Sequence, residues 1–578
     1  LLSVIFISLL FFSGRSITGP KELQAIQIPI GLFLIYIFFI VGSIFKSEFS
    51  IIYVLFFLIV LSIIGIWRSK DILVKDFLIL LLAFIFISPL LIFGVLSHNN
   101  LWDDYTNWIP PARYLYKNHH LPTLEEPIIN HVTSSYSYLR ALVHSLINLP
   151  ISEFNKNIQI VFNILFGSTI FLWATPFAKI INQKDKVLIK NIITLMGSFF
   201  CFLLVIWIVI LHKLLFSSYS EATYLICLIH LFFYIIIKIE KSNEFRVGKF
   251  NLVLSLLLTI PFLIKDTGFY HSIILFFSYM IAFKLPSLIK NKADIYHDFR
   301  VFVSQFFNLI PLFITKLFWS YYVSANQLSK PFENFFVNDN KLDLIPQILS
   351  SAFHQFSNNT AMILSLIIIV LFFMFSNKSS NNKIINNNSL FLFVLLFSIG
   401  IVFLTLIAYV LVFTPYEAAR AASFSRYINP AAFILWSSLI VATLNLVNNL
   451  NYFVIKISSI AITTIYLLLI LLNFDMYNFD KDIDNKFIKI SSDIIKSFPE
   501  NEDLFIIDLQ TNGIDAVKIK YYINEYMPVN YFASVHLEGP LSKDEIERWF
   551  NNYENIHIHS ASNAQLNLIK EYVNKMNK

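Results

Sequence analysis

The sequence predicts a polytopic α-helical membrane protein of about 13–14 spans, followed by a small C-terminal α/β domain on the extracytoplasmic side. Of the 578 residues, 57% are hydrophobic and only 14% are charged, whereas an ordinary soluble protein carries roughly 25% charged residues. No arrangement of cores hides so much apolar surface from water. Long apolar runs stop near residue 474, and charged residues become common from Asp475 onward. These observations exclude a soluble enzyme, a collagen-like fibre and a disulfide scaffold.

Candidate spans follow from the apolar runs, because a helix that crosses the hydrocarbon layer needs about 20 apolar residues. Leu1 lies inside such a run and a second run follows almost at once, which favours a missing start or an unusual start codon over a cleaved signal peptide. The sequence predicts about fourteen spans. They lie near 1–13, 27–45, 50–67, 76–97, 158–181, 190–211, 219–237, 250–264, 269–285, 300–322, 359–376, 388–413, 427–447 and 453–473.

The orientation of the spans follows from the basic residues, which gather in one set of alternating short loops. The positive-inside rule assigns this set to the cytoplasm. The connections 98–157, 323–358 and 414–426 and the tail then fall on the opposite side. The same rule accounts for the net charge of +6, so we expect no nucleic-acid partner. The cytoplasmic set is Arg68, Lys70, Lys75, Lys179, Lys184, Lys186, Lys190, Lys238, Lys241, Arg246, Lys249, Lys284, Lys290, Lys292, Arg300, Lys378 and Lys383.

The chain divides into four predicted parts: N-terminal spans 1–97, an external loop 98–157, a transmembrane core 158–474 and an extracytoplasmic domain 475–578. In the last part, short strands are predicted at 502–509, 530–537 and 555–559, with helices at 514–526, 542–553 and 563–576. Strands that alternate with helices indicate an α/β domain with a mainly parallel sheet. His557 and His559 share a strand face, but we prefer a structural role for them over a metal site.

The loop 98–157 carries the most informative polar residues. Asp103 and Asp104 follow a predicted span directly and are framed by Trp102 and Trp108. Carboxylates beside hydrocarbon are costly and point to function. Such a carboxylate can act as a general base toward a hydroxyl, or bind a divalent cation. The alternative is an N-cap for a helix predicted over 105–118, and we favour the functional interpretation.

This segment resembles the first external loop of the GT-C glycosyltransferases. The resemblance rests on the Asp-Asp pair after a span and on Pro111-Ala112-Arg113-Tyr114 in an interfacial helix. It implies a GT-C-like fold and an inverting enzyme that takes sugar from a polyprenyl-phosphate carrier on the external face. It further implies that Asp103 or Asp104 is the catalytic base. Members of the superfamily commonly have one span before this loop, whereas four are predicted here.

Two further external segments carry cations. Lys265 and Asp266 lie between two apolar stretches. In the functional interpretation, Lys265 binds a phosphate through a charge-assisted hydrogen bond. In the alternative, the segment is a tight turn and the Lys265 side chain extends to water. Arg420 and Arg426 lie in the link 414–426, on the side of the membrane where the positive-inside rule expects few basic residues. Their presence there favours a specific anionic partner. In the alternative interpretation, the link is a surface helix in which the charge of Glu417 pairs with one of the two arginines. By the resemblance, Arg426 and Tyr427 lie near the carrier-lipid site, and Arg113 joins them as a candidate for the donor phosphate.

Histidines follow the Asp pair along the same loop. His119, His120 and His131, with Glu125 and Glu126, invite a metal proposal, but their spacing matches no closed zinc pattern. A solvated or substrate-facing loop is preferred, with His119 and His120 as substrate-loop candidates. The need for a divalent cation, or for any cofactor, stays open. Further on, Arg140 and His144 lie one helical turn apart and share a face.

The leading interpretation is therefore a membrane glycosyltransferase that moves a sugar from a polyprenyl-phosphate-linked donor to a glycan, lipid or protein acceptor at the external face of the bilayer. The rivals are a transporter or flippase of a lipid-linked saccharide and a glycan polymerase or ligase. The usual cue for a polymerase is arginine in two large external loops, and 323–358 contains none. Lys-, Asn- and Ile-rich composition indicates an AT-rich bacterial source, and hence a cell (inner) membrane location.

Overall fold

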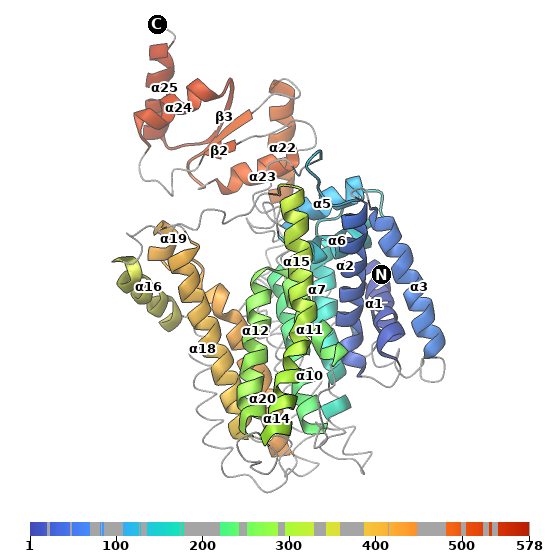
Figure 1. The fold of residues 1–578 in the computed structure, drawn as a ribbon. Helices are drawn as coiled ribbons and strands as arrows, with labels where there is room; N and C mark the ends of the chain where they lie inside the picture. Colours follow the sequence, from blue (N-terminus) through green and yellow to red (C-terminus); the bar gives the residue numbers. More distant parts are fainter. Residues whose placement is uncertain are drawn as a thin grey trace.

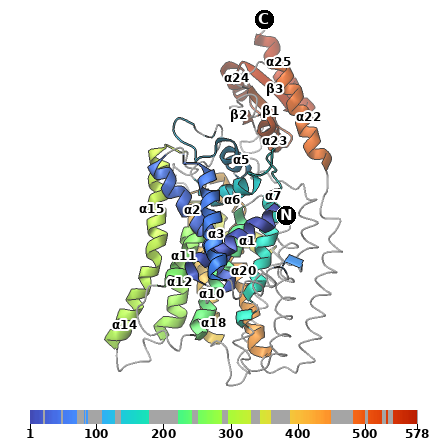
Figure 2. The same cartoon turned by 90° about the vertical axis from the view of Figure 1, so that its right-hand side faces the viewer.

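The computed structural model describes residues 1–19, 23–46, 49–69, 81, 84–85, 108–126, 128, 136–173, 175–177, 220–241, 251–286, 295–328, 343–358, 387–413, 415–447, 481–498, 504–511, 513–523, 531–533 and 541–576. Most of them form a bundle of helices, and a smaller α/β domain lies beyond one end of that bundle (Figure 1). The view from the side shows the same two parts (Figure 2).

The bundle is built from apolar helices, in agreement with the predicted polytopic helical class. Among the described residues, six helical stretches are long and apolar enough to cross a membrane: Gln24–Phe45, Ile51–Arg68, Ile158–Phe177, Ser220–Lys238, Phe302–Ala325 and Asn388–Leu411. Their side chains suit a lipid surround, because exposed apolar residues such as Phe56, Leu317 and Phe403 would be unfavourable in water. The chain is thus a helical membrane protein.

The bounds of the helices in and around the bundle are as follows: α1 Leu2–Thr18, η1 Gln24–Ile26, α2 Gln27–Phe45, α3 Ile51–Arg68, α5 Ile109–Asn118, α6 Leu139–Asn148, α7 Ile158–Ser168, η3 Thr169–Trp173, α10 Ser220–Lys241, α11 Leu252–Ile264, α12 Thr267–Tyr279, η4 Met280–Lys284, α14 Ile295–Ser304, η6 Gln305–Leu309, α15 Ile310–Ala325, α16 Ile345–Ser357, α18 Asn387–Leu411, α19 Pro415–Ala419 and α20 Phe424–Val447. Every predicted span that falls on described residues coincides with helix. The predicted span 76–97 lies largely outside the described residues, and 190–211, 359–376 and 453–473 lie wholly outside them.

Small residues let the first three helices pack closely. A Cβ on Gly65 of α3 would lie 1.9 Å from the backbone oxygen of Phe12 in α1, so only glycine allows this approach. The hydroxyl of Ser62, one turn earlier, donates to the Leu9 carbonyl across the same interface at 2.8 Å. Close backbone approach through small residues is a common way for helices to associate in a bilayer, where burial from water supplies no driving force.

The C-terminal domain is a three-layer α/β unit. Its parallel sheet has the order β2-β1-β3, with β1 at Leu504–Asp508, β2 at Tyr531–Ala533 and β3 at Asn555–Ser560. Leu504 and Ile506 face one layer and Phe505 and Ile507 the other, because successive strand residues point to opposite faces. The helices are α22 Lys481–Ser497, α23 Ile514–Ile523, α24 Lys543–Asn552 and α25 Asn563–Met576. The predicted parallel sheet and the last three helices are confirmed, whereas α22 was not predicted.

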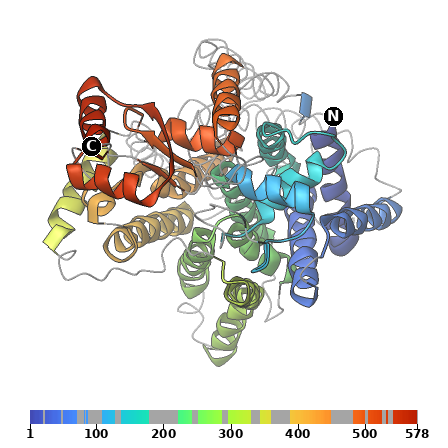
Figure 3. The same cartoon turned by 90° about the horizontal axis from the view of Figure 1, so that it is seen from above.

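Two short helices lie between the bundle and this domain. Helices α5 and α6 pack on each other, and the Ser145 hydroxyl of α6 donates to the Ala112 carbonyl of α5 at 2.6 Å. Seen from above, α23 lies beside α5 near the middle of the molecule (Figure 3). Helix α5 covers the second part of the predicted interfacial helix 105–118; the first part lies outside the described residues.

Candidate functional site

A pocket lies where the first turns of α10, α12 and α20 meet. It holds about 260 Å³ of space between atoms, part of which is open to solvent. Its lining combines one carboxylate and two cations with aromatic and amide side chains, so it is a polar site set within an apolar bundle. The lining residues are Glu221, Tyr224, Leu225, Lys265, Thr267, His271, Arg426, Tyr427, Asn429 and Pro430.

Lys265 enters the pocket from the sharp turn between α11 and α12. The residue ends α11 with an extended backbone, and its carbonyl accepts the Gly268 amide at 2.8 Å. A Cβ on Gly268 would lie 2.2 Å from the Pro261 backbone oxygen, so the turn requires glycine there. The predicted interruption of two apolar stretches at this point is therefore a tight helical hairpin whose tip carries Lys265.

Glu221 is the partner of this lysine. Its Oε1 accepts from Lys265 Nζ at 2.6 Å and lies 3.6 Å from Nε of Arg426. The side chain of Glu221 is 7% exposed, against 12% for Lys265 and 26% for Arg426. Its place in the first turn of α10 also suits a carboxylate, because the helix dipole favours negative charge there. The three groups form a cluster with one positive charge in excess.

Arg426 and Tyr427 reach the pocket from the start of α20. The preceding link is strained: Ala421 and Ser423 have φ of 45° and 59°, a left-handed conformation that non-glycine residues adopt at a cost of about 1–3 kcal/mol each. Gln355 of α16 stabilises the link by donating to the Ala421 carbonyl at 2.7 Å. Such strain is commonly found at functional sites, and here it directs two predicted site residues into the pocket.

Aromatic and imidazole groups complete this pocket. The Tyr427 ring lies 5.6 Å from Lys265 Nζ and 5.2 Å from Arg426 Cζ, so both cations approach the same ring. The Tyr224 hydroxyl of α10 contacts Nδ1 of His271 in α12. Both residues are buried. They add a hydrogen-bonding pair next to the charged cluster.

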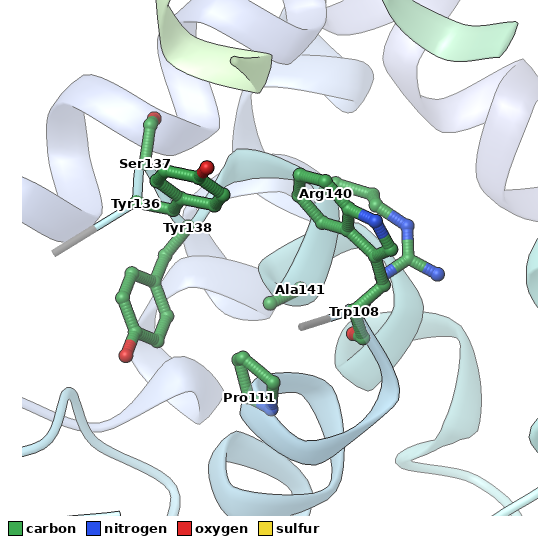
Figure 4. Close-up of a pocket in the computed structure, with 7 residues that line it drawn as sticks. All are labelled: Trp108, Pro111, Tyr136, Ser137, Tyr138, Arg140 and Ala141. Carbon is green, nitrogen blue, oxygen red and sulfur yellow. Dashed lines mark hydrogen bonds between the residues drawn. The ribbon is translucent and has the colours of Figure 1, made fainter. Parts of the chain in front are cut away.

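A second pocket lies between α5 and α6, and it holds about 240 Å³ of space between atoms. The Trp108 indole stacks on the Tyr136 ring, with centroids 5.7 Å apart. The Arg140 guanidinium donates to the Trp108 carbonyl and lies 5.6 Å from its ring. Figure 4 shows these side chains around a central space that is closed below by Pro111. The second pocket is thus lined mainly by aromatic rings, with a buried arginine at one side.

A hydrogen bond ties the lining of the second pocket to the end of α11, which leads to Lys265. Ser137, which lines the second pocket, donates its hydroxyl to the Leu263 carbonyl, two residues before Lys265. The same hydroxyl lies 2.8 Å from the Tyr36 hydroxyl, which in turn accepts the Tyr138 amide. The segment around Ser137 is thus fixed against the end of α11.

Several predicted site residues lie elsewhere. Arg113 donates from Nη1 to the Tyr521 carbonyl at 3.2 Å and lies over that residue's ring. The His119 carbonyl accepts the Ile51 amide at 2.6 Å. His120 lies 3.0 Å from the Glu126 carboxylate. The backbone of Arg420 is held by Gln355. None of these four predicted residues is among the described residues that line the two pockets.

The predicted catalytic pair cannot be placed in either pocket. Trp102, Asp103 and Asp104 lie outside the described residues, and the chain is described again from Trp108 onward. Arg140 lines the second pocket, whereas His144, one turn later, packs against Phe154. Burial and the nearby Arg140 charge lower the pKa of His144 to about 3, so this imidazole is neutral at physiological pH.

Metal ligands do not gather in the part of the chain that the structure describes, where no three His, Cys, Asp or Glu side chains form a group that could hold an ion. The His557 and His559 rings are 6.4 Å apart, and Nε2 of His559 lies 3.4 Å from the Asp515 carboxylate. His559 is thus paired with a carboxylate of α23.

Glu221 is the main residue of the charged cluster that the sequence interpretation did not single out. It opens the predicted span 219–237, so it is a carboxylate next to hydrocarbon, like Asp103 and Asp104. The argument used for the Asp pair, that a carboxylate beside hydrocarbon is unfavourable and points to function, would also have identified Glu221. His271 and Tyr224 gave no comparable signal, because buried polar aromatic side chains are common in helix bundles.

Comparison with known proteins adds no identification. No family model matches the chain, and no curated protein matches it.

Proposed function

We propose that this protein is a membrane glycosyltransferase of GT-C type, which moves a sugar from a polyprenyl-phosphate-linked donor to a glycan, lipid or protein acceptor. One observation carries the proposal. Lys265 and Arg426, from distant parts of the chain, meet at one pocket and are held there by the buried Glu221. The resemblance of the first external loop to GT-C enzymes supplies the reaction type.

The charged cluster suits the phosphate of the donor. Two cations face a single carboxylate, so an anion that enters the pocket meets a net positive site. Hydrogen bonds from charged donors to phosphate are roughly twice as strong as neutral ones. As the sugar leaves its carrier, negative charge grows on the phosphate oxygen. Cations fixed in advance stabilise that charge without reorganisation.

The acceptor side of the reaction is assigned to the loop before α5. In the proposed mechanism, Asp103 or Asp104 takes the proton of the acceptor hydroxyl while that oxygen attacks the anomeric carbon, and the carrier phosphate leaves with the electrons of the broken bond. The configuration at the anomeric carbon inverts. The pocket beside Trp108 and Arg140 supports this assignment, since it follows the Asp pair closely in sequence and offers an aromatic surface to a sugar.

The proposed location is the cell (inner) membrane of a bacterium, with the α/β domain on the extracytoplasmic side. Support comes from the basic loops, which favour the cytoplasm for the opposite end of the bundle. In this orientation both pockets lie toward the external face. Lys265 is linked through Ser137 and α6 to α5, and α5 contacts the α/β domain.

A direct assay tests the enzyme proposal. Purified protein in lipid is given a radiolabelled polyprenyl-phosphate sugar and a mixture of membrane-derived acceptors, and transfer of label is measured. We expect Lys265→Gln to reduce transfer at least about a hundredfold, because a charge on the leaving phosphate loses its partner. Lys238→Gln, at the other end of α10, is the matched control and should keep wild-type activity.

The Asp pair is tested in the same assay. Loss of transfer in either Asp103→Asn or Asp104→Asn, with normal protein yield, supports the base assignment and identifies the residue. Transfer at the wild-type rate in both variants contradicts it.

A transporter or flippase of lipid-linked saccharide is the second candidate. It is favoured by the burial of Glu221 and Lys265 at helix ends inside the bundle, since transporters often place ionisable residues at broken helices. Proteoliposomes separate the two functions. Movement of a fluorescent lipid-linked sugar across the bilayer without any transfer supports the flippase and contradicts the enzyme.

A further inference from the structure

Helix α23 of the C-terminal domain lies against one face of α5. Ile109 and Arg113 are one turn apart on α5, and Val517 and Tyr521 are one turn apart on α23. Ile109, Val517 and Tyr521 form a small buried apolar cluster. Beside it the Arg113 guanidinium lies 4.9 Å from the centroid of the Tyr521 ring and donates to the Tyr521 carbonyl. The contact thus combines apolar burial with a cation over an aromatic ring.

A second contact holds the other end of the same external segment. Lys156, which precedes α7, donates from Nζ to the Tyr522 hydroxyl at 2.9 Å and lies 5.5 Å from the centroid of that ring. Phe154 packs both against this cluster and against the bundle core. Two consecutive tyrosines of α23 therefore contact two segments, 109–113 and 154–156, that flank α6.

The opposite face of α5 belongs to the bundle and to the second pocket. Ala112 and Leu115 are in the bundle core, while Trp108 and Pro111 line the pocket with Arg140. Helix α5 is only ten residues long, and isolated helices of this length are marginal in water. Its position is therefore set by what packs on its two faces, and α23 supplies one of them.

We propose that Tyr521 is a positioning residue, through which the C-terminal domain fixes α5 and the pocket that Trp108 and Pro111 line. One part of the proposal rests on the proposed function, namely that this pocket binds the acceptor of a transferase. It gives Arg113 a structural role, because the Arg113 guanidinium connects α5 to α23, away from the Lys265 and Arg426 cluster.

The test compares three variants of the full-length protein. Tyr521→Ala removes the ring that Arg113 and Ile109 contact, whereas Tyr521→Phe keeps the ring. Both variants keep the main-chain carbonyl to which Arg113 donates. Tyr572→Ala removes a tyrosine of the same domain whose ring packs on Phe550 instead. It controls for a general loosening of the domain.

The first measurement is hydrogen exchange of the amides of residues 109–118, which needs no activity. We expect Tyr521→Ala to speed exchange about tenfold, since local opening follows the loss of packing. Tyr521→Phe and Tyr572→Ala should leave it near wild type. Equal exchange of α5 in Tyr521→Ala and Tyr521→Phe overturns the proposal.

The second measurement is the transfer assay, with KM for the acceptor separated from KM for the donor. A shift in the acceptor KM for Tyr521→Ala, with the donor KM unchanged, supports positioning of the acceptor pocket; equal shifts in both overturn it. Absence of transfer in the wild-type protein overturns the proposed function alone, because the exchange result still decides whether α23 positions α5.

Discussion

Glu221 decides how the charged cluster behaves at the level of single side chains. A lysine and an arginine in a bundle interior repel each other, and the carboxylate between them offsets that repulsion. Removing one partner of a buried ion pair costs about 3–5 kcal/mol, because the remaining charge stays buried without compensation. The carboxylate thus allows the two cations to be held close together inside the bundle.

Replacement of this carboxylate has a predicted cost in stability. We expect Glu221→Gln to destabilise the protein by about 3 kcal/mol, because Lys265 and Arg426 then face each other with no carboxylate between them. Differential scanning fluorimetry of the protein in detergent measures the effect as a lower midpoint. Glu153→Gln, in an exposed loop, is the matched control, and an equal midpoint for the two variants contradicts the role given to Glu221.

Asp508 is the comparable residue in the α/β domain. The residue is fully buried at the end of β1. Its carboxylate accepts the amides of Asp515 and Ala516 at 3.1 Å each, as well as the hydroxyls of Thr511 and Ser560. Burial by itself raises the pKa of this carboxyl, but the hydrogen bonds from Ser560 and Thr511 outweigh it and hold the pKa below its usual value.

The lowered pKa of Asp508 predicts a loss of stability in acid. The contribution of Asp508 is fully present above the ordinary aspartate pKa of about 3.9 and is lost as the pH falls through the lower pKa of the folded state. We expect Asp508→Asn to be less stable by about 2 kcal/mol at neutral pH and to lose less stability on acidification. Thermal midpoints measured from about pH 5 down to about pH 2 follow this loss, because it occurs below the ordinary aspartate pKa. A parallel pH profile for Asp508→Asn and wild type, with the exposed Asp544→Asn as control, contradicts it.

At the scale of elements, the hairpin of α11 and α12 shows what apolar patterning can predict. The interruption at 265–268 was evident in the sequence because charged residues separate two apolar runs. The closeness of the two helices was not, since it depends on a missing Cβ at Gly268. A pattern of apolar residues reports which segments cross a bilayer, whereas packing depends on shape.

The hairpin gives a prediction for Gly268→Ala. The added Cβ would meet backbone at 2.2 Å, and backbone cannot rotate away, so we expect a loss of about 1–3 kcal/mol and weaker transfer through displacement of Lys265. Gly400→Ala is the matched control. Its Cβ would meet a methyl group of Ile274 at 2.5 Å, which the side chain can move, so a smaller loss is expected. The thermal unfolding midpoints of the two variants measure this difference. A larger loss of stability for Gly400→Ala than for Gly268→Ala contradicts the prediction.

The strands and helices of the C-terminal domain could also be predicted from the pattern of apolar residues, except for helix α22. Three strands and three helices were read correctly because strand and helix periods alternate clearly after Asp475. Helix α22 was missed although Phe487 and Ile494 recur at a helical spacing and pack against α23. The high density of charged residues obscured that pattern. In the site, Lys265 and Arg426 were predicted from charge at an interface, and Tyr427 from the resemblance to GT-C enzymes. Their meeting with Glu221 depends on contacts between distant helices, which one sequence does not reveal.

At the scale of the whole molecule, the two ends of the bundle differ in what they carry. One end adjoins the α/β domain, α5 and both pockets. The opposite end includes Lys238 and Lys241 at the end of α10, Lys284 in η4, and α14, which carries Arg300. Basic loops stay in the cytoplasm because their translocation is unfavourable. The pockets and the α/β domain are then expected on the same external side, as the proposed transferase requires.

Cysteine labelling in intact cells tests this orientation. Lys570 on α25 and Arg300 on α14 are both exposed and lie in the two parts that should face opposite sides. We expect a membrane-impermeant maleimide to modify the Lys570→Cys variant in intact cells and the Arg300→Cys variant only after the membrane is permeabilised. The native Cys227 is buried, and the parent protein without added cysteine gives the background. Labelling of Arg300→Cys in intact cells, with Lys570→Cys protected, would reverse the topology and remove the external donor site on which the proposed transferase depends.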